Sequence, residues 1–143
     1  MKPLLVYLQN PADTNEMIPK EVFVVVKPGF LEKANQIIDK FARAGFRFMK
    51  MRTKQLTMGE AKRMYYVHKD ENFYYKLCKY MSSAPCIGIL FDARGIEEPF
   101  KVTSELKDKI RDLWGEDEMK NCLHSSDNAE NMKKEMSVFF LTY

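Results

Sequence analysis

The chain of 143 residues lacks the features that mark several classes of protein. Its three cysteines, at positions 78, 86 and 122, are far apart and form no C-x-x-C pair, so neither a disulfide framework nor a zinc site is indicated. Three free thiols favour a reducing compartment, and we expect a cytoplasmic protein. No apolar run approaches the roughly 18 to 20 residues of a membrane helix, so no membrane partner is expected. The apolar run over residues 4–8 is too short for the core of a signal peptide.

The chain also has little net charge and no glycine-rich phosphate loop. Its 23 lysines and arginines face 20 aspartates and glutamates, an excess that suits contact with anions but is too weak to indicate a nucleic-acid partner. It has no basic stripe and no R/K-G-F/Y-G/A-F motif, as an RNA-binding sheet would have. Without G-x-x-x-x-G-K-[ST], a P-loop nucleotide site is excluded.

Composition and hydrophobic pattern predict one globular domain after an N-terminal extension. Hydrophobic residues make up 45% of the chain and charged residues 30%, a globular balance. We expect the domain to span residues 21–143. Residues 1–20 form the extension, in which 4–8 can make a short edge strand before Pro11 and Pro19 break regular structure.

Four strands and at least four helices are predicted in the domain. Unbroken β-branched and aromatic residues over 22–26 predict a strand buried on both faces, hence central in a sheet. Further strands are predicted at 46–56, 86–91 and 123–124, and helices between Gly29 and Gly45 and at 57–68, 72–81 and 128–140. Residues 92–117 are polar, with helical spacing at 102, 106 and 110. This order predicts an α+β protein with a ferredoxin-like, four-stranded antiparallel sheet covered by helices.

The strongest sign of chemistry is His124, one of only two histidines. In the helix that follows, Met132, Met136 and Phe139 form the apolar stripe, and Glu135 falls within it. A carboxylate that points into a core is costly unless it is paired, and a nearby imidazole can pair with it. An acid that orients a histidine is the arrangement of a nucleophile or general base. The alternative is a solvated histidine and a glutamate that reaches water.

Other polar and aromatic residues are ambiguous on their own. Lys27 ends the buried strand and either extends to water or binds phosphate or carboxylate. Tyr65 and Phe73 flank a charged turn and either clamp a flat ligand or belong to the core. Arg111 is either a solvated arginine or, near a nucleophilic histidine, a phosphate clamp.

Taken together these residues resemble the nucleoside diphosphate kinase family, from about residue 22 to residue 140. The motifs that carry the resemblance are Val24-Val25-Val26-Lys27-Pro28, the hairpin of residues 65–81, Ser83-Ala84-Pro85, Ile110-Arg111, Asn121-x-x-His124-x-Ser126-Asp127, Glu135 and Phe139-Phe140. No single motif is specific to the family, but the whole set is, because the motifs occur in the family's order and at its spacings.

The resemblance implies a role for each matching residue. His124 is expected to take the γ-phosphate of a nucleoside triphosphate and pass it to a nucleoside diphosphate, with Glu135 and Ser126 orienting the imidazole. Phosphate and ribose contacts are expected from Lys27, Tyr65, Arg111 and Asn121, and Phe73 is expected to pack on the base. Magnesium is expected to arrive with the nucleotide rather than in a metal site of the protein, and a homo-oligomer is expected.

Departures from the family pattern cluster in one region. Asp-Gly after Lys-Pro is replaced by Gly29-Phe30, and His-Gly-Ser by His124-Ser125-Ser126. The chain between residues 91 and 111 is several residues shorter than in the family, and this stretch normally supplies a second phosphate-binding arginine and a threonine. Lys101 and Thr103 are the expected substitutes. A non-catalytic nucleotide-binding or scaffolding module therefore stands as the alternative function, and a nucleic-acid binder as a third.

Overall fold

The protein, described here from a computed structural model over residues 20–140, folds around one four-stranded antiparallel sheet. The strands are β1 (Glu21–Val26), β2 (Arg47–Lys54), β3 (Cys86–Asp92) and β4 (Leu123–Ser125), in the order β2-β3-β1-β4. The α-helices are α2 (Ala34–Arg43), α3 (Met58–Met64), α4 (Tyr74–Met81), α5 (Pro99–Trp114) and α6 (Ala129–Phe139), with 3₁₀ turns η2 (Leu31–Lys33) and η3 (Tyr66–His68). This arrangement confirms the predicted ferredoxin-like α+β class.

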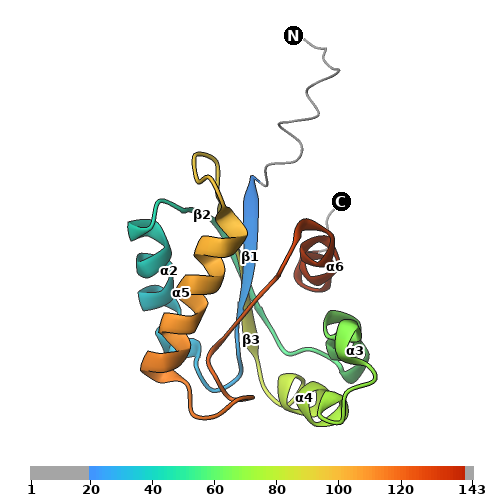
Figure 1. Ribbon diagram of the computed structural model, residues 1–143. Coiled ribbons are helices and arrows are strands. Elements are labelled where there is room, and N and C mark those ends of the chain that lie inside the picture. The colour runs from blue at the N-terminus through green and yellow to red at the C-terminus, as the bar shows by residue number, and fades with distance from the viewer. Residues whose placement is uncertain (1–19, 141–143) are drawn as a thin grey trace, which may run out of the picture.

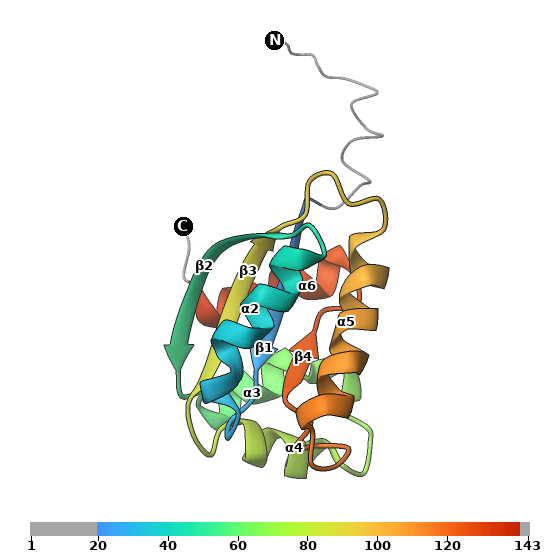
Figure 2. The same cartoon turned by 90° about the vertical axis from the view of Figure 1, so that its left-hand side faces the viewer.

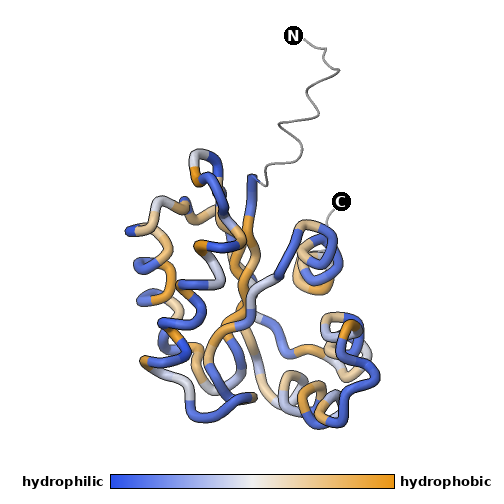
Figure 3. The backbone as a smooth tube through the Cα atoms, viewed as in Figure 1, coloured by the Kyte–Doolittle hydropathy of each residue, from blue (hydrophilic) through white to orange (hydrophobic). Residues whose placement is uncertain are grey.

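The sheet separates two layers of helices, as Figure 1 shows. Helices α2 and α5 cover one face, and α3, α4 and α6 cover the other. In Figure 2, β2, β3, β1 and β4 lie side by side behind α2 and α5. Apolar segments concentrate along the strands and the inner sides of the helices (Figure 3). The core is therefore split in two by the sheet.

Strand β1 is central because alternate residues serve both halves of the core. Val22, Val24 and Val26 pack into the half under α2 and α5, whereas Phe23 and Val25 pack into the half under α3, α4 and α6. This confirms the strand predicted to be buried on both faces. The two sides of β1 thereby bind both helix layers into one unit.

The segment that was difficult to assign from sequence forms the longest helix of the described residues. Helix α5 begins at Pro99, whose fixed φ suits the first helical turn. It buries Thr103 and Ile110, and Phe100, Val102 and Leu106 pack against the core as partly buried side chains. Its register places one face against β4 and the other in water, which decides which of its polar side chains reach the interior.

The N-terminal prediction lies almost wholly outside the described residues. Lys20 is the first residue that the structure describes, so the expected extension and its edge strand at 4–8 stay predictions. A capping box formed by Thr57 and Glu60 opens α3, where each side chain accepts a hydrogen bond from the other residue's backbone N–H.

Helix α6 docks on the sheet at a position where only glycine fits. A Cβ at Gly88 of β3 would lie 2.7 Å from Cγ of Phe139 and 2.9 Å from Cζ of Phe23. We expect Gly88→Ala to displace α6, which carries Glu135, and to lower the free energy of unfolding by about 1–3 kcal/mol. Urea denaturation measures the change.

Gly59→Ala is the matched control, because its Cβ would meet nothing closer than 3.9 Å at the exposed start of α3. We expect it to be neutral or slightly stabilising, since alanine is the better helix former. Equal stability of the two variants would contradict the close packing of α6 on β3.

Candidate active site

The centre of the site is a carboxylate that holds a histidine. His124 lies on β4, opposite Val25 of β1, and Glu135 lies on α6. His124 Nε2 is 2.8 Å from Glu135 Oε1, and Ser126 Oγ donates to the same oxygen at 2.5 Å. Glu135 is 6% exposed, so these two partners are what stabilise it in the core. A carboxylate only accepts hydrogen bonds, so Nε2 carries the proton and Nδ1 of the ring is left with a free lone pair.

An unusual backbone turn presents this histidine. Cys122 has φ 84°, rare for a residue other than glycine. Leu123 N donates to Asn121 O at 3.1 Å, which closes a three-residue turn around Cys122. Lys27 N donates to Cys122 O at 2.9 Å and ties this turn to the end of β1. Strained backbone of this kind is typical of functional sites, and here it brings Lys27, Asn121 and His124 together.

A cavity of about 380 Å³ opens beside the histidine. Its lining residues are Lys27, Tyr65, His68, Phe73, Leu77, Lys107, Arg111, Glu118, Met119, Asn121, His124, Ser125 and Asp127. Six residues singled out from the sequence are thereby brought together from distant parts of the chain: Lys27, Tyr65, Phe73, Arg111, Asn121 and His124. Ser126 and Glu135 lie behind the imidazole.

One end of the cavity is cationic. Lys27 is 3% exposed, and its Nζ donates to Met119 O at 3.1 Å. Arg111 Nε donates to Leu123 O at 3.0 Å. Burial, followed by repulsion from Arg111 and Lys107, lowers the pKa of Lys27 to about 7. Within residues 20–140, none of the three cations forms an ion pair with a carboxylate. The end is therefore suited to an anion.

The other end is aromatic and apolar. The Phe73 ring is 43% exposed and lies 5.4 Å from the His68 ring, and Leu77 lines the wall beside them. The Tyr65 ring meets the His124 ring edge-on at 5.0 Å, whereas the adjoining Tyr66 is 56% exposed. An exposed ring beside apolar wall suits a flat ligand.

Two buried polar atoms of residues that line the cavity have no hydrogen-bond partner within residues 20–140. They are the hydroxyl of Tyr65 and Oδ1 of Asn121, whose Nδ2 donates to Glu118 O at 2.7 Å. Burial, followed by the charge of Glu135, raises the pKa of Tyr65, so its hydroxyl keeps its proton. Unsatisfied buried groups cost free energy, and a ligand with its own donors and acceptors can satisfy them.

Lys101 and Thr103, the residues expected to replace the phosphate contacts of the shortened segment, do not line the cavity. Lys101 is exposed on the first turn of α5 and does not line the cavity. Thr103 is 1% exposed and does not line the cavity, and its hydroxyl is buried without a partner among the described residues. The cation that α5 brings to the cavity besides Arg111 is Lys107, which sequence reasoning missed. Its spacing of four from Arg111 places both on one helix face, and that spacing was the available clue.

Comparison with known proteins gives a consistent result. The profile of the nucleoside diphosphate kinase family matches residues 20–143. The nucleoside diphosphate kinase of Prosthecochloris aestuarii is 32% identical over 132 residues, 86% of this chain and 94% of that protein. That of Kosmotoga olearia is 30% identical over 135 residues, 86% of this chain and 90% of that protein.

Solved structures agree with the sequence relatives. The crystal structure of the Aquifex aeolicus nucleoside diphosphate kinase superposes with a TM-score of 0.72 at 28% identity, covering 85% of this chain and 94% of that one. The enzyme from Encephalitozoon cuniculi gives a TM-score of 0.75 at 19% identity, over 84% and 88% of the two chains, and shares the fold. The chain belongs to the nucleoside diphosphate kinase family.

Within the described residues, no helix is both long and apolar enough to cross a membrane.

The buried Lys27 should cost stability, because its pKa of about 7 in the folded protein lies below the 10.5 of a free lysine. Below pH 7, Lys27 is protonated in both the folded and the unfolded protein, so the folded state bears the full free-energy cost of burying the charge. This cost decreases as the pH rises from 7 towards 10.5. We expect Lys27→Met to raise the free energy of unfolding by about 3 kcal/mol near pH 6. Urea denaturation without ligand from pH 6 to 9 should show the difference shrinking above pH 7.

Lys109→Met on the exposed side of α5 is the control, and we expect it to change the free energy of unfolding by no more than about 0.5 kcal/mol. A Lys27→Met variant that is less stable than the wild type at pH 6 would show that the buried ammonium is well compensated.

Proposed function

We propose that the protein is a nucleoside diphosphate kinase that moves the γ-phosphate of a nucleoside triphosphate to a nucleoside diphosphate through phosphorylated His124. The single observation that carries this proposal is the Glu135–His124 pair, which leaves one imidazole nitrogen free at the wall of a cationic cavity. Family membership supports the same reaction.

His124 would act as the nucleophile in both halves of a ping-pong cycle. Nδ1 attacks the γ-phosphorus, the bond from phosphorus to the β-phosphate oxygen breaks, and the nucleoside diphosphate leaves. A terminal phosphate oxygen of a second diphosphate then attacks, and the P–N bond breaks. Positive charge develops on the ring in the first step, and the Glu135 carboxylate at 2.8 Å from Nε2 stabilises it.

The remaining residues position the nucleotide. Phosphoryl transfer depends chiefly on in-line placement and on cations around the equatorial oxygens, and Lys27 and Arg111 lie where they can supply them. The unpartnered Tyr65 hydroxyl can donate to a phosphate oxygen, and the unpartnered Asn121 Oδ1 can accept from a ribose hydroxyl. The exposed Phe73 ring suits the face of a base, and stacking of this kind discriminates weakly between bases.

Magnesium would be carried by the nucleotide. Phosphate oxygens are ligands that magnesium prefers, with one or two carboxylates at most from a protein. The donor set fits this role, because Asp127 lines the cavity and the described residues contain no cluster of three His, Cys, Asp or Glu side chains that could hold an ion unaided. When bound, the ion neutralises phosphate charge that develops in the transfer.

The protein is proposed to act as a cytoplasmic homo-oligomer, with the kinase domain spanning residues 21–143. Cys78, Cys86 and Cys122 are buried free thiols, which suits a reducing compartment. Edge strand β2 exposes Phe48, Met49 and Met51 at 40–46%, apolar surface of the kind that subunit contacts cover. Light scattering that finds a 16.8 kDa particle at working concentrations would contradict an oligomer.

Incubation with ATP and magnesium, without acceptor, should add one phosphoryl group to the wild-type protein. Intact mass measures it, and a phosphohistidine is acid-labile, alkali-stable and discharged by GDP. We expect His124→Ala to add none and to lose at least about 10⁴-fold in kcat, because the nucleophile is gone.

His68→Ala shows which of the two histidines is phosphorylated. This variant should still accept a phosphoryl group, although its affinity for nucleotide changes. Glu135→Gln keeps the nucleophile but loses the carboxylate, and phosphoenzyme formation should slow by about 10²-fold. If the wild type binds nucleotide but never becomes phosphorylated, the protein is a nucleotide-binding module and the kinase proposal fails.

A further inference from the structure

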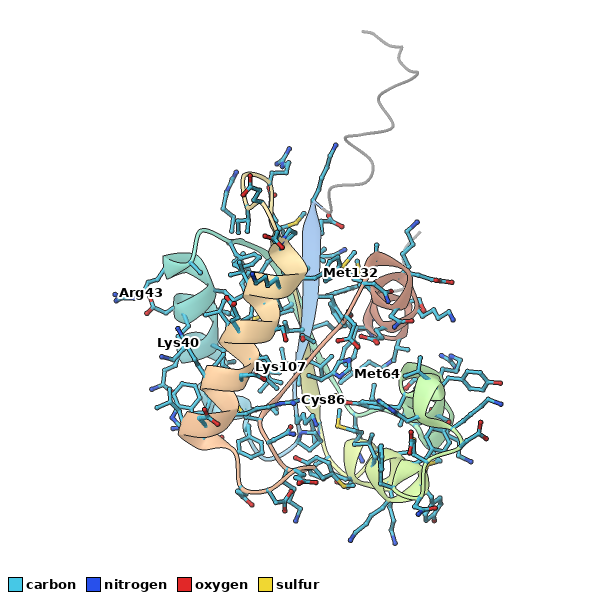
Figure 4. All side chains as sticks on the ribbon, in the orientation of Figure 1. Lys40, Arg43, Met64, Cys86, Lys107 and Met132 are labelled. Atoms are coloured by element: carbon cyan, nitrogen blue, oxygen red, sulfur yellow. The ribbon has the colours of Figure 1, made fainter. Side chains whose placement is uncertain are left out.

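Helix α5 brings a second cation to the phosphate end of the cavity. Lys107 lies one helical turn before Arg111, and both line the cavity with Lys27. In Figure 4, Arg43 extends outward from α2, whereas Lys107 is on the side of α5 turned towards the middle of the molecule. Three cations from two elements therefore converge on one cavity.

This convergence contributes nothing favourable to folding by itself. Lys107 and Arg111 line the same cavity as Lys27, and both lower the pKa of Lys27. Along residues 20–140 none of the three forms an ion pair. Three cations without an ion-pair partner around one cavity favour the binding of an anion there.

The helix that carries Lys107 also contacts the strand that carries His124. Arg111, one helical turn after Lys107, donates to the carbonyl of Leu123, the residue before His124. Lys107, His124 and Asp127 all line the cavity. Lys107 is thus held on a packed helix beside the strand of His124, in the wall of the cavity where a phosphoryl group would be transferred.

We propose that Lys107 is a nucleotide-binding residue that contacts the terminal phosphate next to His124. The inference rests on the proposed function for the identity of the ligand, a nucleoside di- or triphosphate. Lys107 then supplies from a helix the positive charge that was expected from Lys101, which is exposed and does not line the cavity. Because α5 is packed on the core, this cation is held without a mobile loop.

Binding of inorganic tripolyphosphate by calorimetry tests the phosphate end without the base. We expect Lys107→Met to weaken its binding about tenfold or more, the loss typical of a charge-assisted hydrogen bond to phosphate. The same variant should lose a similar factor in kcat/KM for ATP. Lys107→Arg, which keeps the charge, should restore both to within about threefold.

Two controls separate this role from a structural one. Lys109→Met removes the same charge from the exposed side of the same helix and should change neither measurement. Phe73→Ala should weaken ADP but leave tripolyphosphate unaffected, because its ring lies at the apolar end. Thermal unfolding checks that each variant is folded.

The inference would be overturned if folded Lys107→Met binds tripolyphosphate with an affinity within twofold of the wild type. It would also be overturned if Lys107→Arg fails to restore the affinity that Lys107→Met loses. The kinase proposal fails separately, when the wild type forms no phosphoenzyme. In that case a Lys107-dependent affinity for tripolyphosphate would still establish the contact.

Discussion

The site depends on one buried carboxylate. Glu135 on α6 is removed from water and accepts hydrogen bonds from His124 of β4 and from Ser126, which follows that strand. Breaking either bond would leave a charged group unpaired in the core, which costs far more than a surface contact. The pairing also selects the imidazole tautomer and leaves Nδ1 open to the cavity. One interaction therefore joins α6 to β4, orients the ring and specifies which atom can react.

Repulsion is the second organising feature. Lys27, Lys107 and Arg111 line one cavity from a strand end and a packed helix, and the two cations of α5 lower the pKa of Lys27. The backbone carbonyls of Met119 and Leu123 partly compensate Lys27 and Arg111. Such a site is prepared for a polyanion before it arrives, so little reorganisation is needed on binding.

Much of this could be predicted from patterns along the chain. The run over 22–26 predicted a central strand, because apolar residues at both alternating sets of positions leave neither face of the strand for water. Glu135 on an apolar stripe predicted a partner for a buried carboxylate. The succession of elements predicted the four-stranded antiparallel sheet covered by helices. Helix α5 was harder, because Lys101, Lys107 and Lys109 look alike in a polar segment, and only the helix register against β4 decides which of them faces the cavity. The loop at Cys122 could not be predicted, since nothing in its side chain requires a positive φ.

By itself the sequence determined the family, the α+β class and the identity of the histidine and its acid, because these depend on residue types at set spacings and on hydrophobic period. Only the tertiary structure decided the rest. It placed Lys107 rather than Lys101 in the wall of the cavity that His124 lines, and left buried polar atoms of Tyr65 and Asn121 without a partner among the described residues. It also buried Lys27 deeply enough to lower its pKa. The physical reason is that burial, charge proximity and hydrogen-bond satisfaction are properties of neighbours in space, and those neighbours come from segments up to about a hundred residues apart in the chain.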